Sequence, residues 1–153
     1  MKFAIRKFIL TVAILALLPI QILAAPNSEQ YDEIILLDNG CYITVELHTH
    51  QTRAANTTSG SKIYVYRNSS GSEEWRATLT GTFTYNGASA TCTVPSLDVS
   101  ISNTAWYVIS KTAARSGNEA IGQLTMGRKF LGITTSEIPV SLKITCDPNG
   151  NLS

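Results

Sequence analysis

The sequence is poor in the residues that most often carry catalytic chemistry. Its 153 residues include only two histidines and three cysteines. No Gly-x-Ser-x-Gly motif occurs, so the nucleophile elbow of the α/β-hydrolases is excluded. Both histidines, His48 and His50, lie in one segment, and strand alternation would place Cys41 on the opposite face from both of them. We therefore expect a protein that is not an enzyme and that uses no cofactor.

The sequence also lacks a charge bias and a second long apolar run. Its 12 basic and 11 acidic residues form no basic stripe and no acidic tail, so we expect no nucleic-acid partner. The longest apolar run, Phe8–Ile20, is shorter than the ~20 residues that span a bilayer. No other stretch approaches that length, so we expect no stable membrane anchor once this segment is removed.

The N-terminal segment has the order of features that marks a secretory signal peptide. Lys2, Arg6 and Lys7 precede the apolar run, and Ala24 supplies a small residue for cleavage. A retained anchor is the less favoured alternative. Removal of residues 1–24 takes away three basic and no acidic residues, which leaves nine basic against 11 acidic and a net charge of −2. The sequence thus predicts a secreted, extracellular protein in an oxidising compartment.

The remainder of the chain alternates between apolar and polar residues with a period of two. Clear examples are Cys41–Thr49 and Glu74–Thr80, and Asn86-Gly87 is a strong hairpin signal. Turn signals recur every ~8–12 residues, which is typical of a sandwich or small barrel. We expect an all-β, antiparallel β-sandwich of seven or eight strands over residues 40–153. Residues 25–39 are expected to form a flexible N-terminal segment, in which 34–37 form a short helix or an edge strand.

Each of the three cysteines alternates onto an apolar strand face. An odd number in an exported protein allows one bridge and one free thiol. We favour a Cys92–Cys146 bridge, which would close a loop worth about 4 kcal/mol in the chain-entropy model, with Cys41 as a small buried apolar residue. The alternative is three reduced, buried thiols. A core bridge beside an inward-facing Trp75 or Trp106 would suit an immunoglobulin-like sandwich.

Four segments of the chain have a recognisable pattern. They are Lys62–Gly71 through Trp75, Leu79–Thr93 with its Gly-Thr-Phe-Thr-Tyr-Asn-Gly core, Lys111–Ala120, and Leu142–Ser153 with its Thr-Cys-x-x-x-Gly-x-Leu-Ser ending. Together they resemble a group of small exported proteins of Gram-positive anaerobes, especially gut Clostridia, over about residues 38–153. The resemblance implies secretion, a β-rich fold and a Cys92–Cys146 pair, and it implies no activity. Cys41 stands where an aromatic residue is commoner in the group.

One cluster has the composition of a metal half-site. Glu46, His48 and His50 are spaced two apart, so they share one strand face. Histidines with a carboxylate can bind zinc, although such sites need three or four ligands from more than one element. No second cluster is visible, and we favour an ordinary solvated strand face with no bound metal.

Two further candidates concern ligand binding and hydrolysis. Tyr64 and Tyr66 share a strand face and would stack a sugar ring or a peptide if exposed; the favoured alternative is that they pack inside the protein. Glu73 and Glu74 follow a hairpin loop and are expected at its solvated edge, not as the facing carboxylates that glycoside hydrolysis requires.

The expected function follows from these observations. We expect a small exported, non-enzymatic protein that binds a carbohydrate or another protein at the cell surface or in the medium. The first alternative is a secreted antibacterial or effector polypeptide. The second and least favoured is a hydrolase, because no catalytic constellation is visible.

Overall fold

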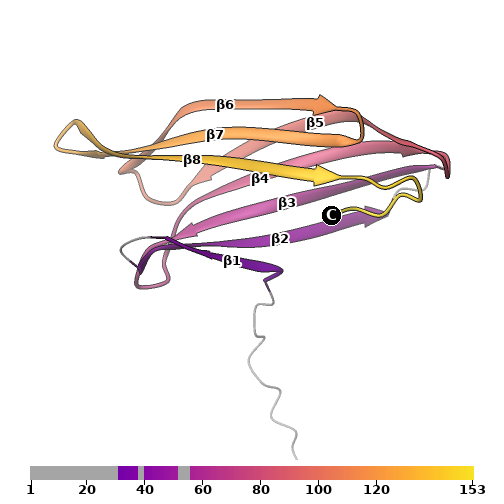
Figure 1. Ribbon diagram of the computed structural model, residues 1–153. Helices are drawn as coiled ribbons and strands as arrows, with labels where there is room; N and C mark the ends of the chain where they lie inside the picture. Colours follow the sequence, from indigo (N-terminus) through magenta and orange to yellow (C-terminus); the bar gives the residue numbers. More distant parts are fainter. Residues whose placement is uncertain (1–30, 38–39, 52–55) are drawn as a thin grey trace, which may run out of the picture.

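Two antiparallel sheets face each other across a single core, which confirms the all-β sandwich (Figure 1). The computed structural model describes residues 31–37, 40–51 and 56–153, so the predicted signal peptide lies outside the described residues. One sheet has five strands in the order β1-β2-β3-β4-β5, and the other has three in the order β6-β7-β8. The strands are β1 (Glu33–Leu36), β2 (Tyr42–Gln51), β3 (Thr57–Arg67), β4 (Glu73–Tyr85), β5 (Ala90–Ile101), β6 (Trp106–Ser116), β7 (Glu119–Phe130) and β8 (Ile133–Thr145).

The first sheet begins earlier than the sequence pattern predicted. Strand β1 pairs antiparallel with β2 and adds an edge strand to the sheet, so of the two alternatives for this segment the edge strand is confirmed. The sandwich therefore starts at Glu33, not at residue 40. Strand β3 also begins at Thr57, inside residues 51–61, whose Asn, Thr, Ser and Gly content predicts a flexible linker. Gly60 of this stretch pairs with Gly81 of β4. No helix in the described part of the chain is long and apolar enough to cross a membrane.

The strand order is sequential within each sheet. Every strand pairs only with its neighbours along the chain, whereas an immunoglobulin sandwich is wound as a Greek key. Nor does Trp75 lie beside Cys92, as an immunoglobulin-like core would require. Cys92 pairs with Phe83, while Trp75 pairs with Ile101 at the far end of β5. The sandwich is thus shown, and its sheets are meanders.

The core follows the predicted alternation along β4. Trp75, Ala77 and Leu79 are fully buried and face the second sheet, where Leu124 and Leu142 are buried in the same cluster. Burial of each large apolar side chain contributes about 1.5–3 kcal/mol. Packing between the two sheets, rather than any single bond, therefore holds the fold.

Cys92 and Cys146 are not joined by a disulfide in the structure, which corrects the predicted Cys92–Cys146 bridge. Both residues are fully buried and near one another, and Cys41 is partly buried. Burial raises the pKa of the Cys92 and Cys146 thiols, and the Cys146 thiol donates to the Asp147 carbonyl at 3.4 Å. Both effects favour the protonated thiol, which is the unreactive form.

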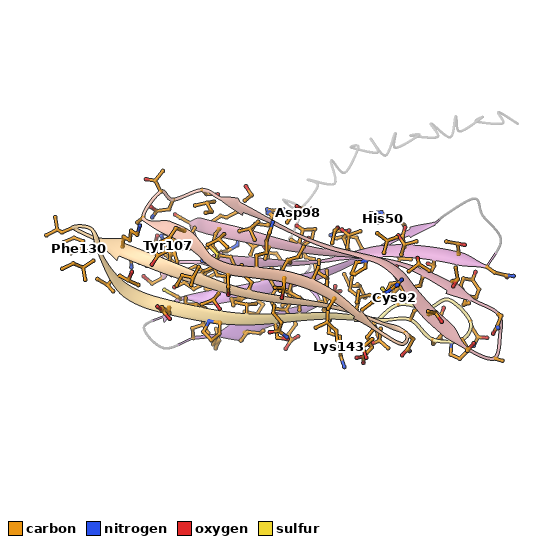
Figure 2. All side chains as sticks on the ribbon, turned by 90° about the horizontal axis from the view of Figure 1, so that it is seen from above. His50, Cys92, Asp98, Tyr107, Phe130 and Lys143 are labelled. Carbon is orange, nitrogen blue, oxygen red and sulfur yellow. The ribbon has the colours of Figure 1, made fainter. Side chains whose placement is uncertain are left out.

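The sandwich has two distinct ends. We call the end with the loops 68–72 and 102–105 and the β7–β8 hairpin the pocket end. The opposite end, with Cys92 and Cys146, is the cysteine end. Figure 2 shows Phe130 at one extremity of the molecule and Cys92 towards the other.

Candidate functional site

A β-bulge at the start of β4 places an acidic side chain inside the pocket end. Tyr66 pairs with Trp75 and Arg67 pairs with Glu73, so Glu74 is an extra residue without a partner on β3. A bulge shifts the alternation of a strand and redirects one side chain. Glu74 is consequently only 7% exposed, which corrects the prediction of a solvated edge.

Its neighbour Glu73 remains near the surface. There it forms an ion pair with Arg76, with 2.9 Å between Oε2 and Nη2, and the hydrogen bond from Arg76 holds the pKa of the Glu73 carboxyl below its usual value. Two adjacent acids therefore have opposite environments.

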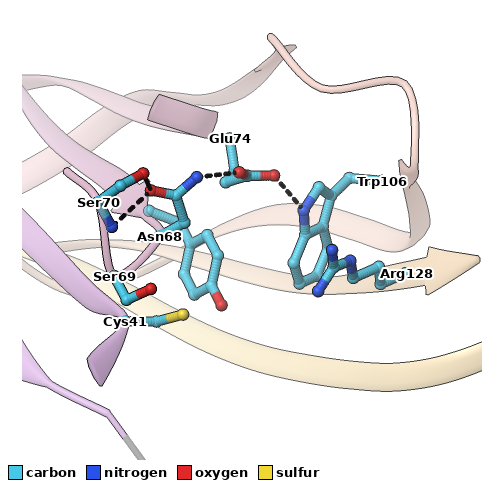
Figure 3. Close-up of a pocket in the computed structure, with 8 residues that line it drawn as sticks. Cys41, Asn68, Ser69, Ser70, Glu74, Trp106 and Arg128 are labelled. Carbon is cyan, nitrogen blue, oxygen red and sulfur yellow. Dashed lines mark hydrogen bonds between the residues drawn. The ribbon is translucent and has the colours of Figure 1, made fainter. Parts of the chain in front are cut away.

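The Glu74 carboxylate accepts hydrogen bonds from three neutral donors. Asn68 Nδ2 donates to Oε1 at 2.7 Å, while Asn103 Nδ2 and Trp106 Nε1 donate to Oε2 at 2.6 and 2.9 Å. Two of these bonds can be followed in Figure 3. The backbone carbonyl of Glu74 also accepts from the amides of Ser102 and Asn103. Glu74 thereby joins the β3–β4 loop to the connection between the two sheets, and the donors offset the cost of its burial.

Three aromatic rings form the inner wall beside Glu74. Tyr66 stacks on Trp75 with a centroid distance of 5.2 Å, and Trp106 meets Tyr66 edge-on at 5.1 Å. Burial raises the pKa of the Tyr66 hydroxyl, and its hydrogen bond with Cys41 adds to this effect. Such edge and stacked contacts contribute about 0.5–1.5 kcal/mol each beyond burial, so this wall is rigid.

The predicted tyrosine pair does not form an exposed platform. Tyr66 is buried at 6% exposure, and Tyr64 is partly buried against the core. Burial also raises the pKa of Tyr64, as expected for a phenol removed from water. The alternative of packing inside the protein therefore holds, and of the two residues only Tyr66 lines the pocket.

A cavity of about 320 Å³ opens between these groups. Figure 3 shows Glu74 and Trp106 on one side, with Asn68, Ser69 and Ser70 of the β3–β4 loop opposite. Its volume is at the lower end of the range of small-ligand sites. The lining residues are Cys41, Tyr66, Asn68, Ser69, Ser70, Glu74, Trp106 and Arg128.

A second hollow lies beside the first and shares Arg128 with it. It encloses about 390 Å³ and is lined by Ala105, Arg128, Lys129, Phe130 and Thr135. The Arg128 guanidinium lies 5.9 Å from the centroid of the Trp106 ring, a cation–π distance. At the pocket end, the first hollow is thus lined by the Glu74 carboxylate and Arg128, and the second by the two cations Arg128 and Lys129.

The histidine cluster does not assemble into a metal site. Glu46, His48 and His50 are on the outer face of β2, as predicted, and Glu46 Oε2 is 3.0 Å from His48 Nε2. His50 Nε2 instead contacts the hydroxyl of Ser61 at 3.3 Å. Within the described ranges no group of three or more potential ligands could hold a metal ion. Cys41 faces the interior, so the cysteine–histidine dyad is not formed either.

Sequence reasoning missed most of this site. Glu74 was placed on the wrong face because the bulge interrupts the alternation. Asn103, Trp106 and Arg128 come from segments that only the packing of the two sheets brings together. The only local signal was an acid beside a turn, which is a common surface pattern.

Comparison with known proteins gives no independent indication of function. No family model, no curated protein and no solved structure matches the chain. The site is therefore interpreted from its own geometry.

Proposed function

We propose that the protein is a small exported, non-enzymatic binding module that holds a hydroxyl-rich ligand, such as a carbohydrate, at the pocket end. The observation that carries this proposal is the buried, hydrogen-bonded carboxylate of Glu74 at the wall of an open cavity. A carboxylate offers about four lone-pair positions, and three are used by the neutral donors. One acceptor position remains for a ligand hydroxyl.

The other lining groups support a polar, uncharged ligand. Ser69 places a hydroxyl group on the loop side of the cavity, beside Asn68 and Ser70, which are bonded to each other, and Arg128 lines it from β7. The edges of Tyr66 and Trp106 supply apolar surface between them. Sugars present this same mixture of hydroxyls and apolar ring faces, and binding of this kind needs a few placed polar groups among apolar ones.

The same composition supports binding rather than hydrolysis. Of the described residues that line the cavity, Glu74 is the only carboxylate. Glycoside hydrolysis ordinarily uses two carboxyl groups across the scissile bond.

Export is supported by the N-terminal sequence. Three basic residues, the apolar run and Ala24 form a signal peptide pattern. Intact-mass measurement of protein recovered from the culture medium tests this directly, and the expected mass begins at Ala25. Retention of the full chain in the cells would contradict export.

A glycan array tests the binding proposal. Ser69→Trp fills the cavity from a loop residue that does not itself bond to Glu74, and Ala88→Trp places the same side chain on the exposed hairpin at the cysteine end. We expect the wild type and Ala88→Trp to retain the same glycans, and Ser69→Trp to bind them at least about tenfold more weakly. Equal binding by all three proteins, or none by the wild type, would contradict the proposal.

One feature favours the antibacterial alternative as a second candidate. The tip of the β7–β8 hairpin exposes three large apolar residues, an unusual surface for a protein that only binds sugars. A spot assay on neighbouring bacterial strains separates the two functions, because only an antibacterial polypeptide would clear a lawn.

A further inference from the structure

The β7–β8 hairpin ends in an apolar tip that projects from the sandwich. Phe130, Leu131 and Ile133 are 69%, 87% and 70% exposed. The hairpin lies at one end of the molecule in Figure 1, and Figure 2 places Phe130 at that extremity. The last backbone pair, Phe130 with Ile133, closes the ladder, so the tip is an ordered turn with outward-facing side chains.

The turn is built with a residue that does not suit it. Leu131 has φ 50° and Gly132 has φ 82°. Two successive positive φ values belong to a tight hairpin turn that favours Asn-Gly, and a leucine in the left-handed region is strained. Because Leu131 is almost fully exposed, its packing within the protein contributes little free energy to offset this strain. The β4–β5 hairpin turns differently: its positive φ, 83°, is at Gly87, and Asn86 stabilises the loop because its side-chain oxygen accepts from the amides of Ala88 and Ser89.

A basic and amphipathic layer lies directly behind the tip. Lys129 pairs with Thr134 on the next rung of the hairpin, and its ammonium is 4.3 Å from the centroid of the Tyr107 ring. The Tyr107 hydroxyl bonds to Thr134 Oγ1 at 2.6 Å. Arg128 follows one rung deeper. From the tip inward, the apolar side chains therefore come first, and Tyr107 with the two cations comes next.

The acidic groups lie farther from the tip. Glu137 pairs with Gly127, one rung beyond Arg128, and Glu74 is buried behind Trp106. Among the described residues of the hairpin between Arg128 and Ser136 there are two cations and no acid. The outer part of the hairpin is therefore locally positive although the mature chain is predicted to be acidic.

We propose that this hairpin docks the protein on an anionic phospholipid bilayer, with Phe130, Leu131 and Ile133 inserted between the lipids. A fluid lipid layer can accommodate a convex apolar tip without a preformed groove. A folded protein partner would need a groove of complementary shape. The cations behind the tip match the phosphates of anionic lipids, and tyrosine is favoured at the membrane interface. The hollow lined by Arg128, Lys129 and Phe130 offers space for one headgroup phosphate.

The proposed attachment is shallow and reversible. Three apolar side chains and two cations give peripheral binding, not the irreversible insertion of a spanning segment. This agrees with the expectation of no stable membrane anchor. The inference goes beyond the proposed function, because it concerns the hairpin and not the ligand of the cavity.

Depth-sensitive fluorescence tests whether the tip itself enters the bilayer. Phe130→Trp reports from the tip and Ala88→Trp reports from the opposite end, and the test uses vesicles of equal parts phosphatidylglycerol and phosphatidylcholine with brominated acyl chains. We expect a blue shift and quenching for Phe130→Trp only. Trp75 and Trp106 emit in every variant, so each spectrum is compared with that of the wild type. The difference reports the introduced tryptophan alone, and attachment through the N-terminal segment does not reproduce it. Equal quenching at both positions, or none at Phe130→Trp, overturns the proposal.

Vesicle flotation of the exported protein gives the energetic test. Leu131→Asn combined with Ile133→Ser should reduce partitioning at least about tenfold, since each buried apolar side chain contributes substantially. Lys129→Gln should weaken binding and reduce its sensitivity to salt, and pure phosphatidylcholine should bind less than the mixture. Unchanged flotation of the double variant overturns the proposal.

Two further outcomes separate the proposal from its rivals. If the wild type sediments as a dimer that Leu131→Asn dissociates, and neither floats with vesicles, the tip binds a second copy and the membrane proposal is overturned. Ser69→Trp, which fills the neighbouring cavity, should float like the wild type. Loss of glycan binding and loss of membrane binding are thus distinguishable.

Discussion

The two ends of the sandwich are built according to different rules. At the cysteine end Phe83, Cys92 and Cys146 are fully buried, and the turns are polar. A side chain at Gly60 would collide with Leu152, which shows how tightly this end is filled. The pocket end instead contains a buried carboxylate, two hollows and an apolar tip. Local departures from optimal packing tend to concentrate at functional sites, which is why we propose the function at the pocket end.

The largest expected effect compares two phenylalanines. Phe83→Ala should lower the free energy of unfolding by about 3–5 kcal/mol, because it opens a cavity in a fully packed region. Phe130→Ala should change it by less than about 0.5 kcal/mol, because that side chain is exposed. Urea denaturation measures both. Similar losses for the two variants would remove the distinction between the ends.

The next comparison uses the adjacent acids of β4. Glu74→Gln should lower the free energy of unfolding by about 1–3 kcal/mol. The NH2 group of the glutamine must then face at least one of the donors that now bond to the carboxylate. Glu73→Gln should cost less than about 1 kcal/mol, because its ion pair with Arg76 is largely in solvent. The same denaturation experiment applies. A larger effect at Glu73 would show that the bulge does not bury Glu74.

Thiol reactivity compares the ends without changing the sequence. Cys41 is partly buried at the pocket, while Cys92 and Cys146 are fully buried with raised pKa values. In native protein we expect iodoacetamide to modify Cys41 at least about tenfold faster than the other two, which react only after local opening. Peptide mass spectrometry identifies the sites. An untreated mass lower by two hydrogens would instead reveal a disulfide and contradict the free thiols.

A smaller effect of opposite sign is expected at the tip. Leu131→Asn should stabilise the protein by about 0.5–1 kcal/mol, because asparagine tolerates a positive φ better than leucine. The melting temperature should rise while vesicle binding falls. In the β4–β5 hairpin, Asn86→Leu should lower the stability, since it removes the hydrogen bonds that the asparagine side chain accepts from the Ala88 and Ser89 amides. A fall in stability for Leu131→Asn would show that the leucine serves the fold.

The smallest effect concerns acid conditions at the cysteine end. Asp147 accepts hydrogen bonds from the Asn151 side chain and from the amides of Asn149 and Asn151, which hold the pKa of its carboxyl below 3.8. The contribution of the ionised Asp147 carboxyl to stability is therefore fully present above the pKa that this carboxyl has in the unfolded chain. It is lost as the pH falls through the lower pKa of the folded state. Amide exchange of Asn149 and Asn151 should accelerate only below about pH 4. Acceleration near neutral pH would point to another group.

The sequence predicted the fold where strand alternation is uninterrupted. The inward faces of Trp75, Ala77 and Leu79 and the hairpin at Asn86-Gly87 are confirmed because a two-residue period leaves only two possible faces. Glu74 was misplaced because one inserted residue reverses the phase, and no residue type announces it. The start of β3 was missed because serine and threonine resemble a linker until Gly60 and Gly81 are seen to pair.

The site required the packing of the two sheets. Glu74 and Trp106 are 32 positions apart and meet only when the connection at 102–105 carries the chain from one sheet to the other. Alternation within a strand contains no information about which residues face each other across a sandwich. The apolar tip at 130–133 was also not predicted, because the sequence of a turn alone does not show whether its side chains are covered by the rest of the protein.

The sequential strand order has a consequence for how the chain acquires its structure. Within each sheet every strand after the first pairs with the one immediately before it, so a chain that emerges from its N-terminal side can form the five-stranded sheet one hairpin at a time. Local pairing of this kind keeps loop-closure entropy small and speeds folding. Only the docking of β6–β8 joins distant segments. Until β7 and β8 pack against it, the apolar face of the five-stranded sheet is exposed to solvent. The chain is therefore most prone to aggregate before the second sheet docks.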